Sequence, residues 1–291
     1  MKKIVQRLLI FFFAIPFFLG IVLLLPHYHH LAFNLVVVIV SALGAAEFSG
    51  LLMQKKLSIT KIEAAFLGAL PPTIMILIIN FGFSELLLSS VIAAVVSWLL
   101  VSQIFAQGDA LDKFLNRLAA GLAVLLYPGM LMAWLVRISR WEEMSSVIIL
   151  TFLAATFIND GMAWVTGKLF GKGNQGIVPV SPKKSIAGFA GGTLTSVAVG
   201  LGAALLFPEI FVPKYQSIPG SLPVAGALLG LLTGIAATLG DLGESAIKRS
   251  SGLKDSGNII PGRGGVLDSI DSLALAAPVF YLTFSLIFVH P

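Results

Sequence analysis

Long apolar stretches separated by short polar turns run along almost the whole chain. A helix needs about 20 mostly apolar residues to cross the hydrocarbon core of a bilayer. Nine stretches reach about this length: residues 8–25, 31–53, 63–81, 86–105, 116–136, 145–167, 185–207, 221–240 and 268–289. The pattern therefore predicts an all-α fold, a polytopic integral membrane bundle of about nine transmembrane helices. Lys2, Lys3 and Arg7 precede the first stretch, but its length and the spans that follow favour a retained helix over a cleaved signal peptide.

The composition supports the membrane assignment and excludes other classes. Hydrophobic residues make up 57% of the chain and charged residues 11%, whereas soluble domains carry about 25% charged residues. Cysteine is absent, which excludes disulfides and thiolate metal sites. The net charge of +5 is compatible with binding to anionic lipid. The sequence has no basic face with interleaved aromatic residues, so a nucleic-acid partner is not expected.

The basic residues are distributed unevenly between the two sides of the predicted bundle. With a cytoplasmic N-terminus and nine spans, all of the 19 Lys and Arg residues except Arg137, Arg140 and Lys214 fall at cytoplasmic ends. This asymmetry follows the positive-inside rule and predicts a cytoplasmic N-terminus and an external C-terminus. The richest polar loops, 167–184 and 241–265, then lie on the cytoplasmic side.

Polar residues concentrate in the second half of the chain. We therefore expect residues 1–136 to form a scaffold with dimer or lipid contacts, and residues 137–291 to form a catalytic region with a polar cavity open to the cytoplasm. In "FINDGMAWVTGKLFGK", Asn159 and Asp160 lie deep in a span, with Lys168 nearer the cytoplasmic end. Ionisable groups at that depth are costly, which favours a polar cavity over a structural pair. Glu47, late in the second span, is open to either a structural or a catalytic interpretation.

Small residues and a short basic motif complete the upstream pattern. Glycines recur every four residues in 226–234 and in 188–192, a spacing that lets membrane helices pack closely. In "SPKKSIAGFAGG", Ser181, Lys183 and Lys184 precede a helix that Ser185 is expected to cap. Lysines, hydroxyls and free helix N-terminal amides together suit a phosphate group.

The least apolar stretch is "SAIKRSSGLKDSGNIIPGRGGVLDSID", residues 245–271. Asp241, Ser245 and Lys248 recur at i, i+4 and i+7, one face of a helix that continues out of the eighth span. Asp268 and Asp271 stand at i and i+3 where the ninth span begins. Carboxylates that converge repel one another unless a cation joins them, and Mg²⁺ prefers oxygen ligands. The pattern predicts a metal-assisted site for phosphoryl or nucleotidyl transfer, where Gly264 and Gly265 let backbone N–H groups approach phosphate.

The order S-x-x-K-R-x4-K-D-x-G-x2-hydrophobic-P-x-x-G-G-x-x-D-x-x-D between Ser245 and Asp271 resembles the signature of the phosphatidate cytidylyltransferases. The upstream "ND", "GK" and "SPKKS" motifs are similar to that family as well, so the resemblance covers about the C-terminal half. It implies a nine-helix homodimer in a bacterial inner membrane, with the active site facing the cytoplasm. The implied reaction joins CTP and phosphatidic acid into CDP-diacylglycerol and pyrophosphate.

The resemblance also implies roles for individual residues. The metal ligands would be Asp241, Asp268 and Asp271, holding Mg²⁺ and leaving open whether a second metal ion binds. The phosphate groups would be held by Lys248, Arg249 and Lys254, with Asp255 in support. The substrate cavity would be lined by Asn159, Asp160, Lys168, Ser181, Lys183, Lys184, Ser245, Arg263, Gly264 and Gly265.

Three positions depart from the family pattern, and two other functions are compatible with parts of it. The family usually has His at position 263 and Arg at 269, and many members have Glu at 187, where this chain has Arg263, Ser269 and Ala187. A CTP-dependent polyprenol or phytol kinase would share the membrane architecture but transfer the terminal phosphoryl group. A cation-coupled secondary transporter would spread its acids through several helices at the midplane, whereas these acids cluster near lysines.

Overall fold

A computed structural model of the chain describes residues 16–57, 59–102, 104–105, 107–141, 144–214, 220–260 and 264–289. Residues 16–24 are helical. The elements that follow are α2 (His27–Met53), α3 (Lys61–Phe81), α4 (Leu86–Val101), α5 (Asp109–Asp112), α6 (Phe114–Val124), the π-helical turn η1 (Leu125–Met130), α7 (Leu131–Arg137), the 3-10 turn η2 (Ile138–Arg140), α8 (Ser145–Phe170), α9 (Ile186–Leu206), α10 (Ser221–Ser250) and α11 (Leu267–Ile287). The all-α class is confirmed.

Seven helical stretches in the described part of the chain are long and apolar enough to cross a membrane. They are α2, α3, the continuous stretch Phe114–Arg140, α8, α9, α10 and α11. Helix α4 ends at Val101, four residues before its predicted end, and its 16 residues rise only about 24 Å. Of the first predicted span, residues 8–15 lie outside the described residues and residues 16–24 are helical. The chain is thus an integral membrane protein with a polytopic helical bundle.

The chain divides into two compact units. Unit 1 contains Met1–Arg140 and Ile247–Ile270, and unit 2 contains Trp141–Ala246 and Asp271–Pro291. The charged segment 247–270 thus groups with the N-terminal helices. The predicted boundary between a scaffold, residues 1–136, and a catalytic region, residues 137–291, remains a prediction.

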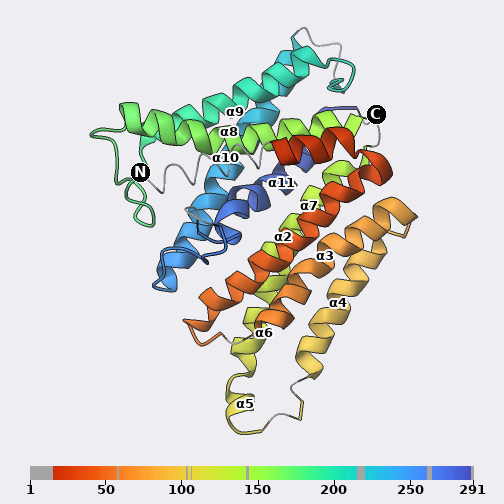
Figure 1. The fold of residues 1–291 in the computed structure, drawn as a ribbon, viewed down its shortest axis with the longest axis vertical. Coiled ribbons are helices and arrows are strands. Elements are labelled where there is room, and N and C mark those ends of the chain that lie inside the picture. The colour runs from red at the N-terminus through yellow and green to blue at the C-terminus, as the bar shows by residue number, and fades with distance from the viewer. Residues whose placement is uncertain are drawn as a thin grey trace. The chain divides into compact units, whose positions relative to one another are not determined.

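In unit 1, α2 packs closely along α3 (Figure 1). A Cβ atom at Gly68 would clash with Ala45, so the two helices need glycine there. Pro71 and Pro72 lie inside α3 without ending it. Because Pro72 has no N–H, the carbonyl of Gly68 loses its helical donor; the Ser41 hydroxyl lies 2.7 Å from it and 2.5 Å from the Pro128 carbonyl, and its one proton serves either carbonyl. This contact fixes α2 against α3 in the turns that precede Glu47.

In unit 2, α8 and α9 lie side by side (Figure 1). The predicted glycine stripes face backbone atoms of neighbouring helices: Gly188 faces Ala163 on α8, and Gly230 on α10 faces Ser196 on α9. Any side chain at these positions would clash, so their predicted packing role is confirmed. Aromatic rings fill the core beside α11, where Trp141 stacks on Tyr281 with centroids 4.9 Å apart.

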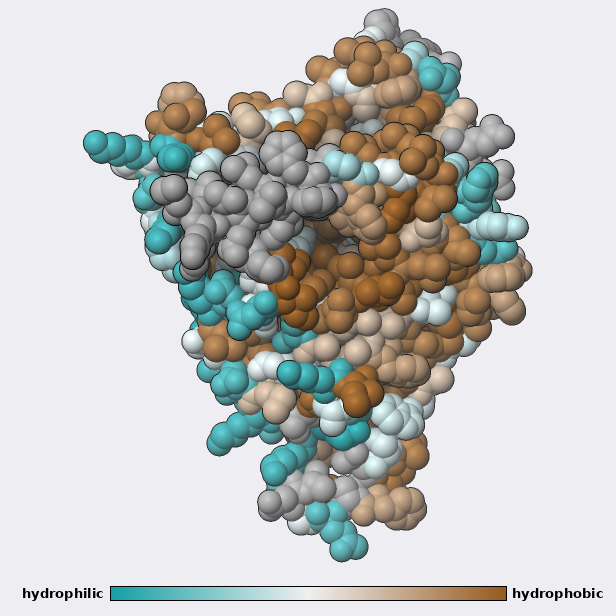
Figure 2. All heavy atoms as spheres, viewed as in Figure 1, coloured by the Kyte–Doolittle hydropathy of each residue, from teal (hydrophilic) through white to brown (hydrophobic). Residues whose placement is uncertain are grey.

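Large apolar side chains are exposed along the membrane helices, as the brown areas of Figure 2 show. Examples are Phe66 on α3, 63% exposed, and Leu194 on α9, 67% exposed. In a water-soluble protein this exposure would promote aggregation, whereas hydrocarbon solvates it. The exposed surface therefore agrees with the hydropathy of the spans.

The orientation of the bundle can be measured by labelling. The chain has no cysteine, so Ser250→Cys in the last turn of α10 and Glu209→Cys beyond α9 each introduce a unique thiol. We expect an impermeant maleimide to label Ser250→Cys only in inside-out vesicles and Glu209→Cys only in right-side-out vesicles, because basic residues gather at the predicted cytoplasmic ends. The reverse pattern would contradict the predicted orientation.

Candidate active site

Helix α10 carries the first predicted face of the site. It continues to Ser250, ten residues past the predicted end of the span at 240, as the face from Asp241 to Lys248 requires. Ser245 is buried, while Asp241 and Lys248 are partly exposed. The predicted helix running out of the eighth span is therefore confirmed.

In unit 2, Asp241 forms an ion pair with Lys184. Lys184 reaches it from the turn before α9, where the Ser185 hydroxyl accepts a hydrogen bond from Gly188 N at 3.1 Å and caps the helix. The predicted cap is confirmed. Both members of the pair are partly exposed, which leaves the ammonium within reach of an anionic ligand.

A second polar contact in unit 2 joins Asp160 on α8 with Asp271 on α11. The Ser272 hydroxyl lies 3.0 Å from Asp160 Oδ2 and 3.3 Å from Asp271 Oδ1. Ser272 N also donates to Asp271 Oδ1 at 2.6 Å. A hydroxyl has one proton to donate, so it serves one carboxylate at a time. Ser272 was missed by sequence reasoning, although it directly follows the last aspartate of the signature.

Close helix packing places Asp241 and Asp271 at neighbouring levels of α10 and α11. A Cβ atom at Gly240 would clash with the carbonyl oxygen of Asp271, so the helices touch one residue before Asp241. Within unit 2, therefore, Lys184, Asp241 and Asp271 gather where these helices meet.

Asn159 is buried and its amide is engaged by other helices. Its Nδ2 donates to Ser196 Oγ at 2.9 Å and to the Gly234 carbonyl at 3.3 Å, and its Oδ1 accepts from Thr238 Oγ1 at 3.4 Å. These contacts join α8, α9 and α10, a structural role that the sequence did not reveal. Its predicted role as a substrate ligand stays a prediction.

In unit 1, Asp268 is surrounded by donors. Lys248 Nζ lies 2.5 Å from Asp268 Oδ1. At Oδ2, Asp268 accepts from Ser256 N at 3.0 Å, from Ser256 Oγ at 3.0 Å and from Gly265 N at 2.7 Å. The Gly265 N–H that was predicted to face phosphate thus binds a carboxylate in this structure. Gly264 has φ of 118°, a conformation that favours glycine.

Glu47 of α2 belongs to the same cluster of unit 1. Its Oε2 accepts from Leu267 N at 2.9 Å and lies 3.1 Å from Ser256 Oγ, whose one proton serves either Glu47 or Asp268. Leu267 is the first residue of α11, so the carboxylate serves an N–H at a helix N-terminus. Sequence reasoning left the role of Glu47 open and missed Ser256, since a contact across 209 positions has no local sequence pattern.

The remaining predicted site residues lie nearer the surface. Exposed side chains belong to Lys168, Lys183, Arg249, Lys254 and Asp255, while Ser181 is partly exposed. Arg263 lies outside the described residues. Of the departures from the family pattern, Ser269 donates to the Gly265 carbonyl at 3.4 Å, and Ala187 N donates to Asn174 Oδ1 at 3.5 Å. Neither contact replaces the charge that the family pattern has at these positions.

The described residues contain no group of three His, Asp or Glu side chains arranged to hold a metal ion. The donor chemistry nevertheless fits Mg²⁺, which proteins usually bind through one or two carboxylates together with substrate phosphates. Asp241 and Asp271 supply such carboxylates in unit 2, and Asp268 supplies one in unit 1. The convergence of all three on one ion remains a prediction.

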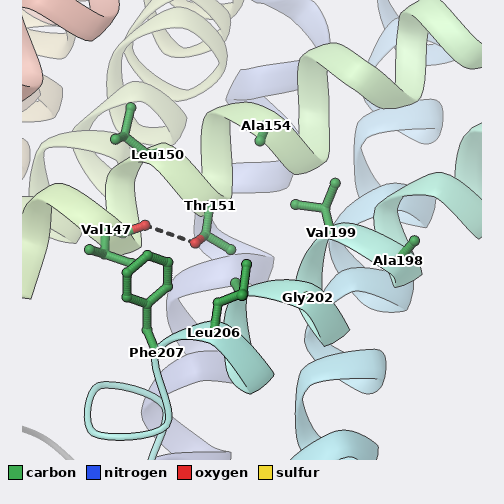
Figure 3. Close-up of a pocket in the computed structure, with 10 residues that line it drawn as sticks. Val147, Leu150, Thr151, Ala154, Ala198, Val199, Gly202, Leu206 and Phe207 are labelled. Carbon is green, nitrogen blue, oxygen red and sulfur yellow. Dashed lines mark hydrogen bonds between the residues drawn. The ribbon is translucent and has the colours of Figure 1, made fainter.

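A groove between α8 and α9 in unit 2 has a different character. It has a volume of about 350 Å³ and is lined by Val147, Leu150, Thr151, Ala154, Ala198, Val199, Gly202, Ala203, Leu206 and Phe207 (Figure 3). Its single hydroxyl, on Thr151, donates to the Val147 carbonyl of its own helix at 2.8 Å. The groove therefore suits hydrocarbon and not a charged phosphate group.

Comparison with known proteins shows the family to which the chain belongs. A model of the cytidylyltransferase family matches residues 5–287. The chain belongs to the cytidylyltransferase family. The match includes both the Lys184–Asp241 pair and the Lys248–Asp268 pair.

Curated relatives agree with this family. A protein named phosphatidate cytidylyltransferase from Synechocystis is 43% identical over 142 residues, which cover 48% of this chain and 44% of the relative. A protein of the same name from Aquifex aeolicus is 34% identical over 169 residues, which cover 58% of this chain and 58% of the relative. The Escherichia coli protein YnbB, described as uncharacterized, is 38% identical over 151 residues, 51% of this chain and 46% of its own length. The chain thus spans about half the length of the curated relatives it matches.

Proposed function

We propose that this protein transfers CMP from CTP to phosphatidic acid, giving CDP-diacylglycerol and pyrophosphate. The observation that carries the proposal is the family match over residues 5–287. The lysine–aspartate pairs on and beside α10 support it, because they supply cations for phosphate oxygens and carboxylates for a metal ion.

In the proposed reaction, a phosphate oxygen of phosphatidic acid attacks the α-phosphorus of CTP. The bond between this phosphorus and the oxygen bridging to the β-phosphate breaks, and pyrophosphate leaves with the bonding electrons. Negative charge accumulates on the transferring and leaving groups, so positioned cations lower the barrier. Lys184 and Lys248 are assigned to bind these phosphate oxygens, and Asp241 and Asp268 orient the two ammonium groups.

Mg²⁺ is proposed as the cofactor, with Asp241, Asp268 and Asp271 as candidate ligands. When bound, such an ion neutralises charge on phosphate oxygens. We expect chelation by EDTA to abolish CMP transfer by the purified protein and added Mg²⁺ to restore it, because the lysines alone leave a polyphosphate substrate with excess negative charge. Full activity after chelation, verified by metal analysis of the sample, would contradict a metal requirement.

The proposed setting is the cytoplasmic face of a bacterial inner membrane, where CTP is available. Basic residues gather at the predicted cytoplasmic ends of the spans and attract anionic lipid as well as nucleotide. A homodimer, implied by the family resemblance, stays part of the proposal. Its test is the mass of the protein in a lipid nanodisc.

The direct assay measures pyrophosphate release. Purified protein in mixed micelles receives CTP and Mg²⁺ with phosphatidic acid, with diacylglycerol or with a polyprenol. We expect pyrophosphate only with phosphatidic acid, and a lipid product with the mass of CDP-diacylglycerol. CDP and a phosphorylated alcohol would indicate a lipid kinase instead.

A further inference from the structure

We propose that Glu47 is a positioning residue of the active site, whose carboxylate holds the signature segment so that Asp268 faces Lys248. Its role in CMP transfer rests on the proposed function, whereas its role in holding the segment does not. The hydrogen bonds of Glu47 go to Ser256 and Leu267 and not to Asp268 or Lys248, so Glu47 acts through these two neighbours.

The first support comes from the hydrogen bonds that Glu47 makes. Its Oε2 accepts from Leu267 N at 2.9 Å and lies 3.1 Å from Ser256 Oγ, whose one proton serves either Glu47 or Asp268, so Glu47 contacts the signature segment 245–271 at its middle and near its end. Ser256 N and Oγ each lie 3.0 Å from Asp268 Oδ2. The Glu47 carboxylate therefore contacts Ser256, which lies beside Asp268 in space, and Leu267, which precedes Asp268 in the sequence.

The second support comes from two glycines of the signature. A Cβ atom at Gly257 would clash with Glu47 Oε1, and one at Gly265 would clash with Glu47 Oε2 and Ser256 Oγ. Real Cβ atoms do not approach other atoms so closely, so a side chain at either position would force the Glu47 carboxylate to move from its place. The signature is shaped to receive this carboxylate.

The third support is the cost of keeping a carboxylate there. Glu47 lies inside a membrane helix, where an acid is unfavourable unless it is paired or hydrogen-bonded. Its Oε1 is buried and has no hydrogen-bond partner among the described residues. Packing alone would be served better by an apolar side chain, so the hydrogen bonds of Oε2 account for the acid.

The helix that carries Glu47 is held by contacts on neighbouring turns. The hydroxyl of Ser41, which precedes Glu47 by six residues on α2, lies 2.7 Å from the Gly68 carbonyl of α3 and 2.5 Å from the Pro128 carbonyl. A Cβ atom at Gly44 would lie 3.0 Å from Ile270 Cδ1, so α2 also packs against the start of α11 within unit 1, one turn before Glu47. Glu47 therefore reaches the turn that carries Asp268 from a helix that is already packed against it.

Two substitutions separate the hydrogen bonds from the volume. Glu47→Leu keeps a similar size and removes both acceptors, whereas Glu47→Gln keeps a carbonyl oxygen for the Oε2 position. Because loss of an outer residue that orients an active-site group typically costs 10–100-fold in activity, we expect kcat to fall by about 10–100-fold in Glu47→Leu and much less in Glu47→Gln. Glu63→Leu is the matched control, since Glu63 lies in the same unit and pairs with Arg117 at 2.8 Å.

Hydrogen–deuterium exchange supplies a measurement that does not depend on activity. We expect faster exchange of residues 264–270 in Glu47→Leu, near wild-type exchange there in Glu47→Gln, and no change there in Glu63→Leu. Unchanged exchange of this segment in Glu47→Leu would overturn the proposal. So would equal losses of kcat in Glu47→Leu and Glu63→Leu, which would indicate a general loss of fold.

A double-mutant cycle tests the glycine argument. Gly257→Ala should speed exchange of residues 264–270 in the wild-type background, because its Cβ displaces the Glu47 carboxylate. In Glu47→Ala the clashing atoms are gone, so adding Gly257→Ala should have little further effect. Additive effects would contradict a direct contact. If wild-type protein fails to transfer CMP, the proposed function fails, and the exchange results still decide the role of Glu47.

Discussion

Asp268→Asn is expected to lower kcat for CMP transfer by about 10³-fold while the protein remains folded. The wild-type carboxylate accepts from Lys248 Nζ at one oxygen and from Ser256 and Gly265 at the other. Asparagine has one carbonyl oxygen, so its amide NH₂ must face either the ammonium or two backbone N–H groups. Donor then opposes donor, Lys248 loses its fixed position, and a charge-stabilising contact worth about 10²–10³ in rate is lost together with a metal-ligand candidate.

Steady-state kinetics in lipid nanodiscs check this result. Asp112→Asn is the control, because Asp112 is an exposed acid of unit 1 in the short helix α5. It should keep wild-type kcat, and both variants should elute as single species on size exclusion. Similar rates for Asp268→Asn and Asp112→Asn would remove Asp268 from the site.

Lys184→Gln is expected to lower kcat/KM by about 10²-fold. The substitution removes the cation that pairs with Asp241 and that is proposed to meet a phosphate oxygen. Charge-assisted hydrogen bonds to phosphate are about twice as strong as neutral ones, and an amide supplies only the neutral kind. Lys61→Gln is the control, since Lys61 is an exposed lysine at the start of α3.

A double-mutant cycle with Asp241→Asn sharpens this second prediction. If Asp241 acts by orienting Lys184, the double variant should lose much less activity than the product of the two single losses. Independent multiplication of the losses would show that the ion pair is not a functional unit. Asp241 would then act through a separate contact, such as a metal ion.

Local sequence patterns predicted the elements that local physics controls. Hydropathy over about 20 residues located the membrane helices, and Ser185 was recognised as the cap of α9. The spacing of Asp241 and Lys248 predicted that α10 continues beyond the membrane stretch, and it does. Small residues at intervals of four predicted close helix packing, which Gly230 shows.

Long-range contacts could not be predicted in the same way. Which side chain meets Asp268 depends on how α2 packs within unit 1, so the Ser256–Glu47 contact carries no sequence pattern. Gly265 illustrates the same limit. Its N–H was predicted to approach phosphate, which stays a prediction; in the structure this N–H donates to Asp268, and the Glu47 carboxylate and the Ser256 hydroxyl lie where its Cβ would be.

The effect of the departures from the family pattern could not be predicted from residue spacing alone. Ser269 makes a hydrogen bond to Gly265 on the first turn of α11 and brings no charge. The cation that the family usually has at position 269 is therefore missing from this turn. Arg263 offers a permanent cation nearby in sequence, and its place in the site stays a prediction.

The position of the transferred phosphorus tests the central claim most directly. Purified protein is given phosphatidic acid and Mg²⁺ with CTP labelled at either the α- or the γ-phosphate, and the lipid fraction is counted. Transfer of CMP predicts label in lipid from α-labelled CTP alone, with γ-label recovered as pyrophosphate. Label in lipid from γ-labelled CTP alone would show phosphoryl transfer and contradict the proposed function.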